Sequence, residues 1–387
     1  MRKFTSRAAA KLFAVAGLLA LSSQAACVTD VGTEGDTEET ASQGDQLSYA
    51  PIGFASVFGT GAPPALWAYN SSGGGINVTS SGTGLYNVTF AGLGSAGGNV
   101  QVVAIGTNNS RCKVGSWGAS GSDEVVHVRC HTASGSLVNS PFVVRFARPD
   151  GGYDGNGAYL WSGWAAPPEN TPFNVDPTYS WNSSGGTNRV VRLDDGLYQA
   201  FLPGLSGAGG SVEITAYGGG SEHCKVGGWG ALSGETFVNV YCFSSTGAPA
   251  NTNFTLNYLA PKQVGAYNYG AYLWAHSSTG SDYVPSSIYS HNTGTDLYSS
   301  CPGYLGDNTA GRWATGYYYA RHSLLSALHS APHITAYGSD SSYCKPSTWD
   351  SWGDGTEVRL RCFNGTGSPV NTRFVETYTS SLTRGPS

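Results

Sequence analysis

One motif occurs three times in this chain, and its spacing limits the possible folds more than any other feature. A cysteine is followed directly by lysine, five residues later by tryptophan, and eighteen residues later by a second cysteine. The first cysteines are Cys112, Cys224 and Cys344, so the copies lie 112 and then 120 residues apart. Recurrence at a nearly fixed period is typical of a chain built from repeated structural units.

The residues before each second cysteine alternate between core-type and polar or bulky side chains. Val238, Val240 and Cys242 occupy one set of alternate positions, and 126–130 and 358–362 follow the same pattern. Period-two alternation predicts a half-buried β-strand with its cysteine on the core side. About seven or eight such strands in about 110 residues predict an antiparallel β-sandwich, immunoglobulin-like in type, with a small barrel as the alternative.

We therefore expect an all-β chain of three tandem modules, each holding one disulfide. The expected modules span 48–149, 153–262 and 265–379, and the third carries an insertion near 295–312. Asp195-Gly196 joins two strand-like segments of the second module, and this dipeptide predicts a type I′ hairpin with positive φ at both residues.

Six of the eight cysteines form three pairs at equal spacing. The simplest pairing is Cys112–Cys130, Cys224–Cys242 and Cys344–Cys362. Each bridge closes a loop of eighteen residues and is expected to stabilise its module by about 3 kcal/mol. The close Cys/His clusters of zinc sites are absent from the sequence, so disulfides and an oxidising compartment are the better interpretation.

The residues between the paired cysteines have two candidate roles. We expect the recurring tryptophans, Trp117, Trp229 and Trp349, to pack in the core over their own disulfides. The lysine beside each first cysteine should point away from the core, either as a solvated edge charge or as part of a ligand-binding face. These lysines are Lys113, Lys225 and Lys345.

The N-terminus has the organisation of an export signal. Basic residues precede the apolar run 12–21, which is too short to span a membrane, and 1–26 is predicted to be a signal peptide. Ala25-Ala26-Cys27 resembles a bacterial lipoprotein box, so either Cys27 is lipidated or ordinary cleavage leaves it in a tail. The acidic segment 27–47 is predicted to be a disordered tether. Membrane attachment is expected only through a lipid on Cys27.

Composition favours an extracellular β protein. Charged residues make up 12% of the chain, which also contains 55 Gly and 23 Tyr. Many short strands joined by turns consume glycine. The net charge of −5 argues against nucleic acid as a partner, since nucleic acid requires a basic face.

The sequence contains no recognisable catalytic or metal-binding pattern, so no catalytic, cofactor-binding or metal-ligating residue is predicted. The third module holds five of the eight histidines, but Pro332 separates His329 from His333 and would break a helix that placed them on one face. We expect these histidines to be scattered over polar faces.

Cys301 has no counterpart in the other copies. An idle thiol or a bridge to another chain explains it better than catalysis does.

The non-recurring tryptophans Trp164, Trp313 and Trp352 are the candidate ligand contacts, because exposed aromatic rings stack on sugars. The second repeat contains Gly-Leu-Tyr at 196–198, Thr-Ala-Tyr-Gly at 215–218 and Cys-Lys-Val-Gly-Gly-Trp at 224–229. With these segments it resembles a module of secreted bacterial proteins. That resemblance implies export and repetition and carries no activity.

The expected function is that of an exported, lipid-anchored cell-surface protein with a binding or structural role. Its expected location is the cell envelope or the extracellular space, and its expected partners are surface polysaccharide or envelope components. A carbohydrate-binding, lectin-like protein is the alternative. A hydrolase with its site in the third module is the third hypothesis, although no catalytic motif supports it. The sequence does not predict an oligomeric state.

Overall fold

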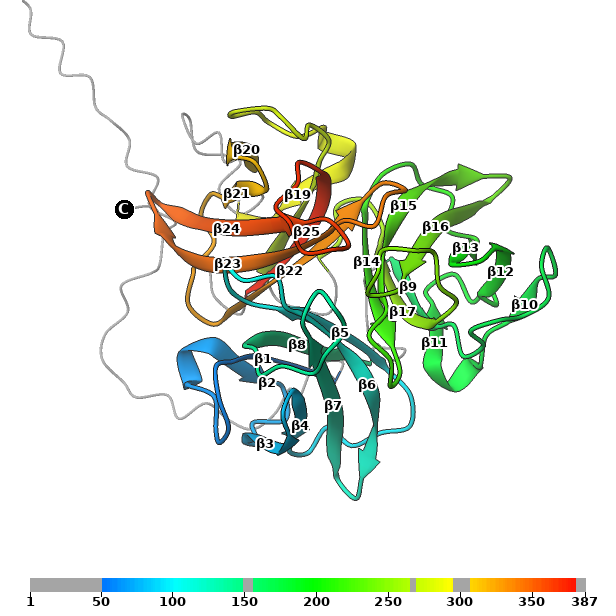
Figure 1. The fold of residues 1–387 in the computed structure, drawn as a ribbon, viewed down its shortest axis with the longest axis horizontal. Coiled ribbons are helices and arrows are strands. Elements are labelled where there is room, and N and C mark those ends of the chain that lie inside the picture. The colour runs from blue at the N-terminus through cyan, green and yellow to red at the C-terminus, as the bar shows by residue number, and fades with distance from the viewer. Residues whose placement is uncertain (1–50, 149–155, 265–268, 295–306, 381–387) are drawn as a thin grey trace, which may run out of the picture. The chain divides into compact units, whose positions relative to one another are not determined.

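The computed structural model describes residues 51–148, 156–264, 269–294 and 307–380, and these residues belong to one compact unit. The predicted signal peptide and tether, Cys27 and Cys301 lie outside the described residues. The fold is all-β, with one disulfide in each of three repeated regions, as the motif spacing predicted. Blue and cyan strands form module 1, green strands module 2, and yellow to red strands module 3 (Figure 1).

Each module is a sandwich of two sheets, which we call the junction sheet and the outer sheet. The junction sheet of module 1 has the order β2-β1-β8-β5, and the outer sheet runs β6-β7-β4-β3. The strands of module 1 are β1 (Ile52–Val57), β2 (Ala68–Asn70), β3 (Ile76–Gly82), β4 (Leu85–Phe90), β5 (Asn99–Ala104), β6 (Arg111–Ser120), β7 (Asp123–His131) and β8 (Phe142–Ala147).

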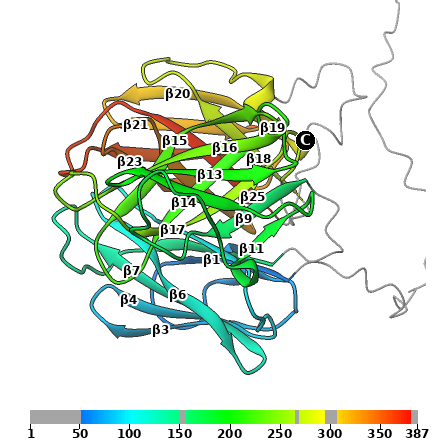
Figure 2. The same ribbon diagram turned by 90° about the vertical axis from the view of Figure 1, so that its right-hand side faces the viewer.

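Modules 2 and 3 repeat this arrangement. Their junction sheets are β11-β9-β17-β14, seen side by side in Figure 2, and β22-β25-β18-β19. The strands of module 2 are β9 (Gly157–Trp161), β10 (Phe173–Asn174), β11 (Ser180–Asn182), β12 (Arg189–Asp194), β13 (Leu197–Pro203), β14 (Ser211–Tyr217), β15 (His223–Leu232), β16 (Glu235–Phe243) and β17 (Asn253–Leu259). Those of module 3 are β18 (Tyr269–Ala275), β19 (Ser290–Asn292), β20 (Thr309–Ala314), β21 (Tyr317–His322), β22 (Ser330–Tyr337), β23 (Tyr343–Trp352), β24 (Gly355–Phe363) and β25 (Arg373–Ser380).

A short 3-10 helix precedes the second strand of each junction sheet: η1 (Ala65–Trp67), η2 (Pro177–Tyr179) and η3 (Ser287–Tyr289). The two sheets of each module enclose a hydrophobic cluster to which both contribute. The cysteines pair directly across the outer sheet, with Cys224 opposite Cys242 and equivalent pairs in the other modules. The alternation in the sequence therefore correctly identified the core side of these strands.

The modules join edge to edge in a cyclic order. Gly218 N donates to Val114 O at 2.9 Å between β14 and β6, and Gly338 N donates to Val226 O at 2.8 Å between β22 and β15. At the third junction Gly106 N donates to Pro346 O at 2.9 Å. Proline takes the place of valine there and has no N–H with which to donate a second bond. The junction strands β5, β14 and β22 contact one another where the three modules meet.

The recurring tryptophans are buried, as predicted, but they pack on the next module as well as on their own. The Trp117 ring lies 5.4 Å from that of Tyr179, and the Trp229 ring lies 5.3 Å from that of Tyr289. Trp349 closes the cycle on module 1, with its ring 5.3 Å from that of Trp67. Our prediction placed each tryptophan over its own disulfide and did not include its contacts with the next module.

The hairpin at Asp195-Gly196 exists, but its turn differs from the predicted type I′. Gly196 has φ of 65°, whereas Asp195 is not among the residues with positive φ. The strand register shifts between Arg192 and Asp194, which accommodates an extra residue in β12. A β-bulge beside a single left-handed glycine therefore replaces a turn that needs two left-handed residues.

Candidate functional site

The three tryptophans that do not recur are exposed, which leaves them available for a ligand. Trp164 is 50% exposed, Trp313 44% and Trp352 46%. The structure does not bring all three together. Trp164 belongs to module 2, where its ring packs on Phe173 at 5.5 Å. Trp313 and Trp352 both belong to the outer sheet of module 3, on its two edge strands β20 and β23.

Strand pairing places aromatic and arginine side chains between these two tryptophans. In β21, the alternate positions Tyr318 and Ala320 are buried in the core, so Tyr317, Tyr319 and Arg321 lie on the opposite face. Tyr317 pairs with Arg361 of β24, and Tyr319 pairs with Arg359. We call the resulting set the aromatic–arginine strip, which consists of Trp313, Tyr317, Tyr319, Arg321, Trp352, Arg359 and Arg361.

The members of the strip stack on one another from one sheet edge to the other. The Arg361 guanidinium lies 3.6 Å from the Tyr317 ring centre, and the Trp313 ring lies 4.8 Å from Tyr317 and 5.0 Å from Tyr319. The Arg321 guanidinium lies between two rings, 4.2 Å from Tyr319 and 4.0 Å from Trp352. Guanidinium groups over aromatic faces are held by the ring quadrupole.

The rings of the strip are not coplanar, so they do not make a single flat platform. Trp313 is inclined by 69° to Tyr317 and by 35° to Tyr319. The Tyr319 ring is buried at 3% exposed, so a ligand on this face would meet the exposed rings of Trp313 and Trp352 with guanidinium groups between them. This arrangement fits a chain of sugar units, each of which offers an apolar face and polar edges, better than it fits one extended flat molecule.

Carboxylates fix two of the three guanidinium groups. Glu357 accepts from Arg321 Nε at 2.9 Å and from Arg359 Nε at 2.9 Å. The hydrogen bond to Glu357 is the main cause that raises the pKa of Arg359. Arg361 differs, because its guanidinium stacks on Tyr317 at 3.6 Å and its Nε is buried without a hydrogen-bond partner among the described residues.

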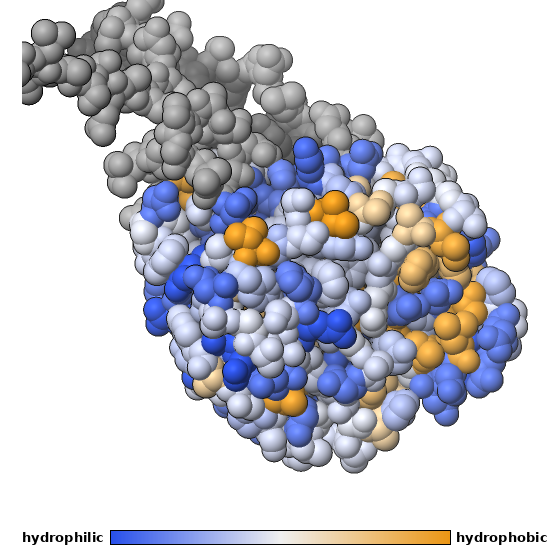
Figure 3. All heavy atoms as spheres, turned by 90° about the horizontal axis from the view of Figure 1, so that it is seen from above, coloured by the Kyte–Doolittle hydropathy of each residue, from blue (hydrophilic) through white to orange (hydrophobic). Residues whose placement is uncertain are grey.

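The strip is peculiar to module 3. In module 2 the positions of Tyr317, Tyr319 and Arg321 are taken by leucine, glutamine and phenylalanine at 197, 199 and 201. Module 2 also has the exposed Leu232 in place of Trp352. Figure 3 shows apolar residues gathered at its right-hand edge, on the side where Figure 1 has module 2. The three outer sheets share a fold and differ in surface chemistry.

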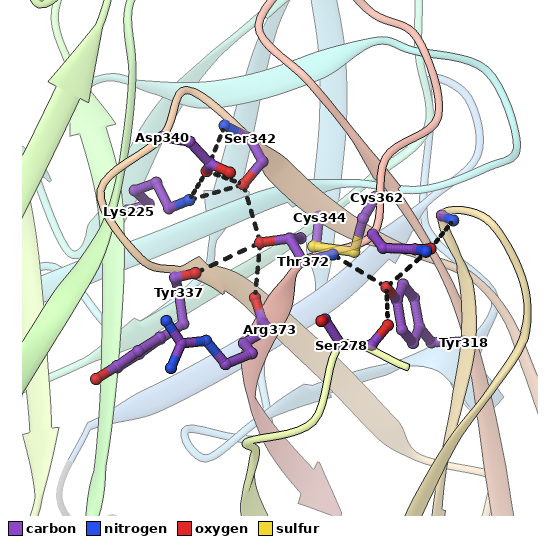
Figure 4. The surroundings of a disulfide bond; sticks show 12 residues. Lys225, Ser278, Tyr318, Tyr337, Asp340, Ser342, Cys344, Cys362, Thr372 and Arg373 are labelled. Carbon is purple, nitrogen blue, oxygen red and sulfur yellow. Dashed lines mark hydrogen bonds and ion pairs between the residues drawn. A yellow bond between two sulfur atoms is a disulfide. The ribbon is translucent and has the colours of Figure 1, made fainter. Parts of the chain in front are cut away.

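The recurring lysines are buried, which contradicts the prediction that they point into solvent. Lys225 is 0% exposed, and its Nζ reaches Asp340 of module 3 at 2.6 Å (Figure 4). Lys113 reaches Glu222 of module 2 at 3.1 Å, and Lys345 reaches Asn108 Oδ1 of module 1 at 2.7 Å. Each lysine does point away from its own core, but the next module covers that face. The recurring lysines therefore connect modules and do not form a ligand-binding face.

Two histidines of module 3 are buried as well, so the prediction of polar-face histidines is wrong for them. His322 Nδ1 lies 2.9 Å from Asn308 Oδ1, and its Nε2 lies 3.3 Å from Glu376 Oε1. His333 lies beside the buried Arg145–Glu213 ion pair. Burial lowers the pKa of His333 well below its usual range, and the Arg145 charge lowers it further. Neither imidazole is exposed to act on a substrate in solution.

Among the described residues, no group of three or more His, Cys, Asp or Glu side chains is arranged to hold a metal ion. Within the same residues no helix is both long enough and apolar enough to cross a membrane. The three disulfides suggest an oxidising, extracellular environment. Cys301 lies outside the described residues.

Comparison with protein-family models, with curated proteins and with solved structures gave no match to this chain.

Proposed function

We propose that this protein is exported and binds polysaccharide at the cell surface through the aromatic–arginine strip of module 3. The observation that carries the proposal is the stacking of exposed Trp313 and Trp352 into one array with tyrosines and arginines. A contiguous patch of exposed aromatic residues often marks a binding site, whereas a single exposed tryptophan does not. The equivalent positions of modules 1 and 2 lack this array, so the fold itself does not require it.

The chemistry of the strip supports a sugar polymer as the ligand. Aromatic rings pack on the apolar faces of sugar rings, and guanidinium groups donate to hydroxyl, carboxylate or sulfate oxygens. A strip that crosses four strands can contact successive sugar units. Binding of this kind requires no catalytic residue, which agrees with the lack of catalytic motifs in the sequence.

Export and attachment remain part of the proposal on the grounds of the sequence. The basic and apolar N-terminal segment supports export, and the three disulfides agree with it. Cys27 is the proposed site of the lipid. Fractionation of cells that carry Cys27→Ser tests this part: the protein should move from the membrane fraction to the medium. An unchanged distribution would contradict lipid attachment at Cys27.

The ligand-binding part can be tested by retention on immobilised polysaccharides of different charge. Trp313→Ala and Trp352→Ala should each weaken retention by about tenfold, since the loss of one ring contact costs about 1 to 2 kcal/mol. Trp164→Ala is the matched control, because Trp164 is equally exposed but lies on module 2. If no polysaccharide retains the wild-type protein, the binding proposal fails and a structural role in the envelope is favoured.

A further inference from the structure

A cavity lies where the three modules meet, away from the aromatic–arginine strip. Its walls come from equivalent stretches of the three junction strands, 102–104 of β5, 214–216 of β14 and 334–336 of β22. The rest of the lining consists of 110–113, 221–224 and 343–345, at and just before the starts of β6, β15 and β23, together with His131 and His333. The cavity offers about 60 Å³ to the centres of water-sized molecules. One water centre needs about 10 to 15 Å³, so a group of about four to six heavy atoms fits.

Three equivalent positions at this cavity carry three different side chains that connect the modules in turn. Arg111 Nη1 lies 2.8 Å from His223 Nδ1, and His223 Nε2 lies 2.8 Å from Ser341 O. The Tyr343 hydroxyl donates to Asn109 O at 2.7 Å. The Arg111 guanidinium also lies 4.9 Å from the Tyr343 ring centre. These contacts leave the arginine fixed at the cavity wall.

The cationic groups of the lining outnumber the anionic ones. Arg111, Lys113 and Lys345 are all buried, whereas Glu222 is the one carboxylate of the lining. Glu222 is paired with Lys113 at 3.1 Å. His223 adds no charge, because burial, together with the Arg111 charge, lowers its pKa to about 3. The positive groups of the lining that have no carboxylate of their own there are therefore Arg111 and, below its lowered pKa of about 7, Lys345.

One buried donor of the lining, Arg111 Nε, has no partner among the described residues, and the Arg111 side chain is 7% exposed. Buried polar atoms nearly always form a hydrogen bond, so an unpaired donor beside a cavity indicates that the cavity contents accept from it. Lys345 Nζ has only neutral oxygen partners, Asn108 Oδ1 at 2.7 Å and Ser110 Oγ at 2.9 Å.

We propose that this junction cavity binds a small oxyanion, of the size of phosphate, sulfate or acetate, with Arg111 and Lys345 as its main charged contacts. Oxyanions suit the site because guanidinium and ammonium groups bind them through charge-assisted hydrogen bonds. Arg111 belongs to module 1 and Lys345 to module 3, and His223 of module 2 holds Arg111 in place. A bound anion thus links all three modules, and its binding stabilises their assembly.

The test is isothermal titration calorimetry of the full-length protein with phosphate, sulfate and acetate, each against chloride at equal ionic strength. Saturable one-site binding of at least one oxyanion is expected, with a Tm that rises as that oxyanion is added. Lys345→Met should weaken binding at least tenfold. Arg359→Gln, in the outer sheet of module 3, is the control and should bind as the wild type does.

A second variant keeps the proposal testable if Lys345→Met folds poorly. Ala104→Leu fills the cavity from its wall while leaving every charged group in place, and it should abolish binding. Near-UV circular dichroism at the titration temperature shows whether each variant is folded. The proposal is overturned if the wild type binds none of the three oxyanions, or if folded Ala104→Leu or Lys345→Met binds them as tightly as the wild type. It is also overturned if binding is lost in Arg359→Gln, since the anion would then sit on the outer sheet.

Discussion

Lys225 of module 2 and Asp340 of module 3 form a hydrogen-bonded ion pair, with 2.6 Å between Nζ and Oδ1 (Figure 4). Asp340 is held in turn by Ser342, whose backbone N–H donates to the same oxygen at 3.2 Å. The geometry recurs at the junction of modules 3 and 1, where Lys345 meets Asn108 and Ser110. The difference is that asparagine replaces aspartate there, so the buried ammonium group lacks an opposite charge.

This difference predicts that Asn108→Asp stabilises the protein. Burial lowers the pKa of Lys345 to about 7, because no carboxylate compensates for the lost hydration. Asp340 shows that aspartate fits the equivalent position. The new ion pair should raise the free energy of unfolding by about 1 to 2 kcal/mol at pH 6, measured by chemical denaturation. Lower stability in Asn108→Asp would contradict this account of the third junction.

The same substitution should change how stability depends on pH. In the wild type, Lys345 is charged in both the folded and the unfolded chain below pH 7. Between pH 7 and about 10.4 the unfolded chain keeps the proton and the folded chain does not, so this group makes stability rise with pH, by at most about 1.4 kcal/mol per unit. Asn108→Asp removes that rise. Its advantage over the wild type should therefore be larger at pH 6 than at pH 9, and an advantage independent of pH would rule out Lys345 as its source.

Trp229→Ala should destabilise the protein far more than Trp352→Ala does. Trp229 is buried, its Nε1 donates to Gly209 O at 2.8 Å, and its ring contacts Tyr289 and Tyr337 of module 3. Loss of a buried tryptophan costs about 3 to 5 kcal/mol. Trp352 is exposed, so its loss should cost about 1 kcal/mol or less. Thermal unfolding of the two variants gives the comparison, and equal Tm values would exclude an interface role for Trp229.

A buried ion pair where the modules meet gives a further prediction. Arg145 of module 1 donates to Glu213 of module 2 and, at 2.8 Å, to Thr379 of module 3. Glu213→Gln keeps the shape but leaves a buried guanidinium without its carboxylate, which should cost about 3 to 5 kcal/mol. The double variant Arg145→Leu, Glu213→Leu removes both charges and should recover part of that loss. Urea denaturation measures both. If the double variant is less stable than Glu213→Gln, the charge is not the cause.

The sequence predicted the three modules but not the contacts between them. The spacing of Cys224 and Cys242 and the alternation around them were enough to find the disulfide, the half-buried strand and the core side. The same alternation correctly turned Lys225 away from its own core. It could not reveal that the opposite face is covered, because periodicity reports the two sides of a strand and carries no information on a neighbour about 115 residues away in the chain.

The candidate ligand site was predicted in part, and for a similar reason. Trp313 and Trp352 could be selected because they do not recur, and both are exposed. Alternation also placed Arg359 and Arg361 on the outward side of their strand. Their stacking on tyrosines depends on the pairing of β21 with β24, a non-local register that composition and spacing do not give. Aromatic residues at alternate positions of the preceding hairpin strand, 317 and 319, were the one signal that could have suggested the strip.

Two glycines of module 2 have nearly the same backbone conformation, and alanine substitutions at them test how closely modules 2 and 3 pack at their junction. Gly209 has φ of 103° and Gly218 has φ of 107°. A Cβ on Gly209 would lie 1.9 Å from Ile288 O of module 3, whereas a Cβ on Gly218 would meet nothing within 4 Å.

Both alanine variants incur the cost of a left-handed residue, about 1 to 2 kcal/mol. Only Gly209→Ala must also displace η3, because backbone atoms cannot move aside as a side chain can. Its free energy of unfolding should therefore fall below that of Gly218→Ala by at least about 2 kcal/mol. Equal losses of unfolding free energy in the two variants would mean that module 3 can shift at this contact at no cost in free energy. The close approach of Gly209 to Ile288 would then not hold the two modules together.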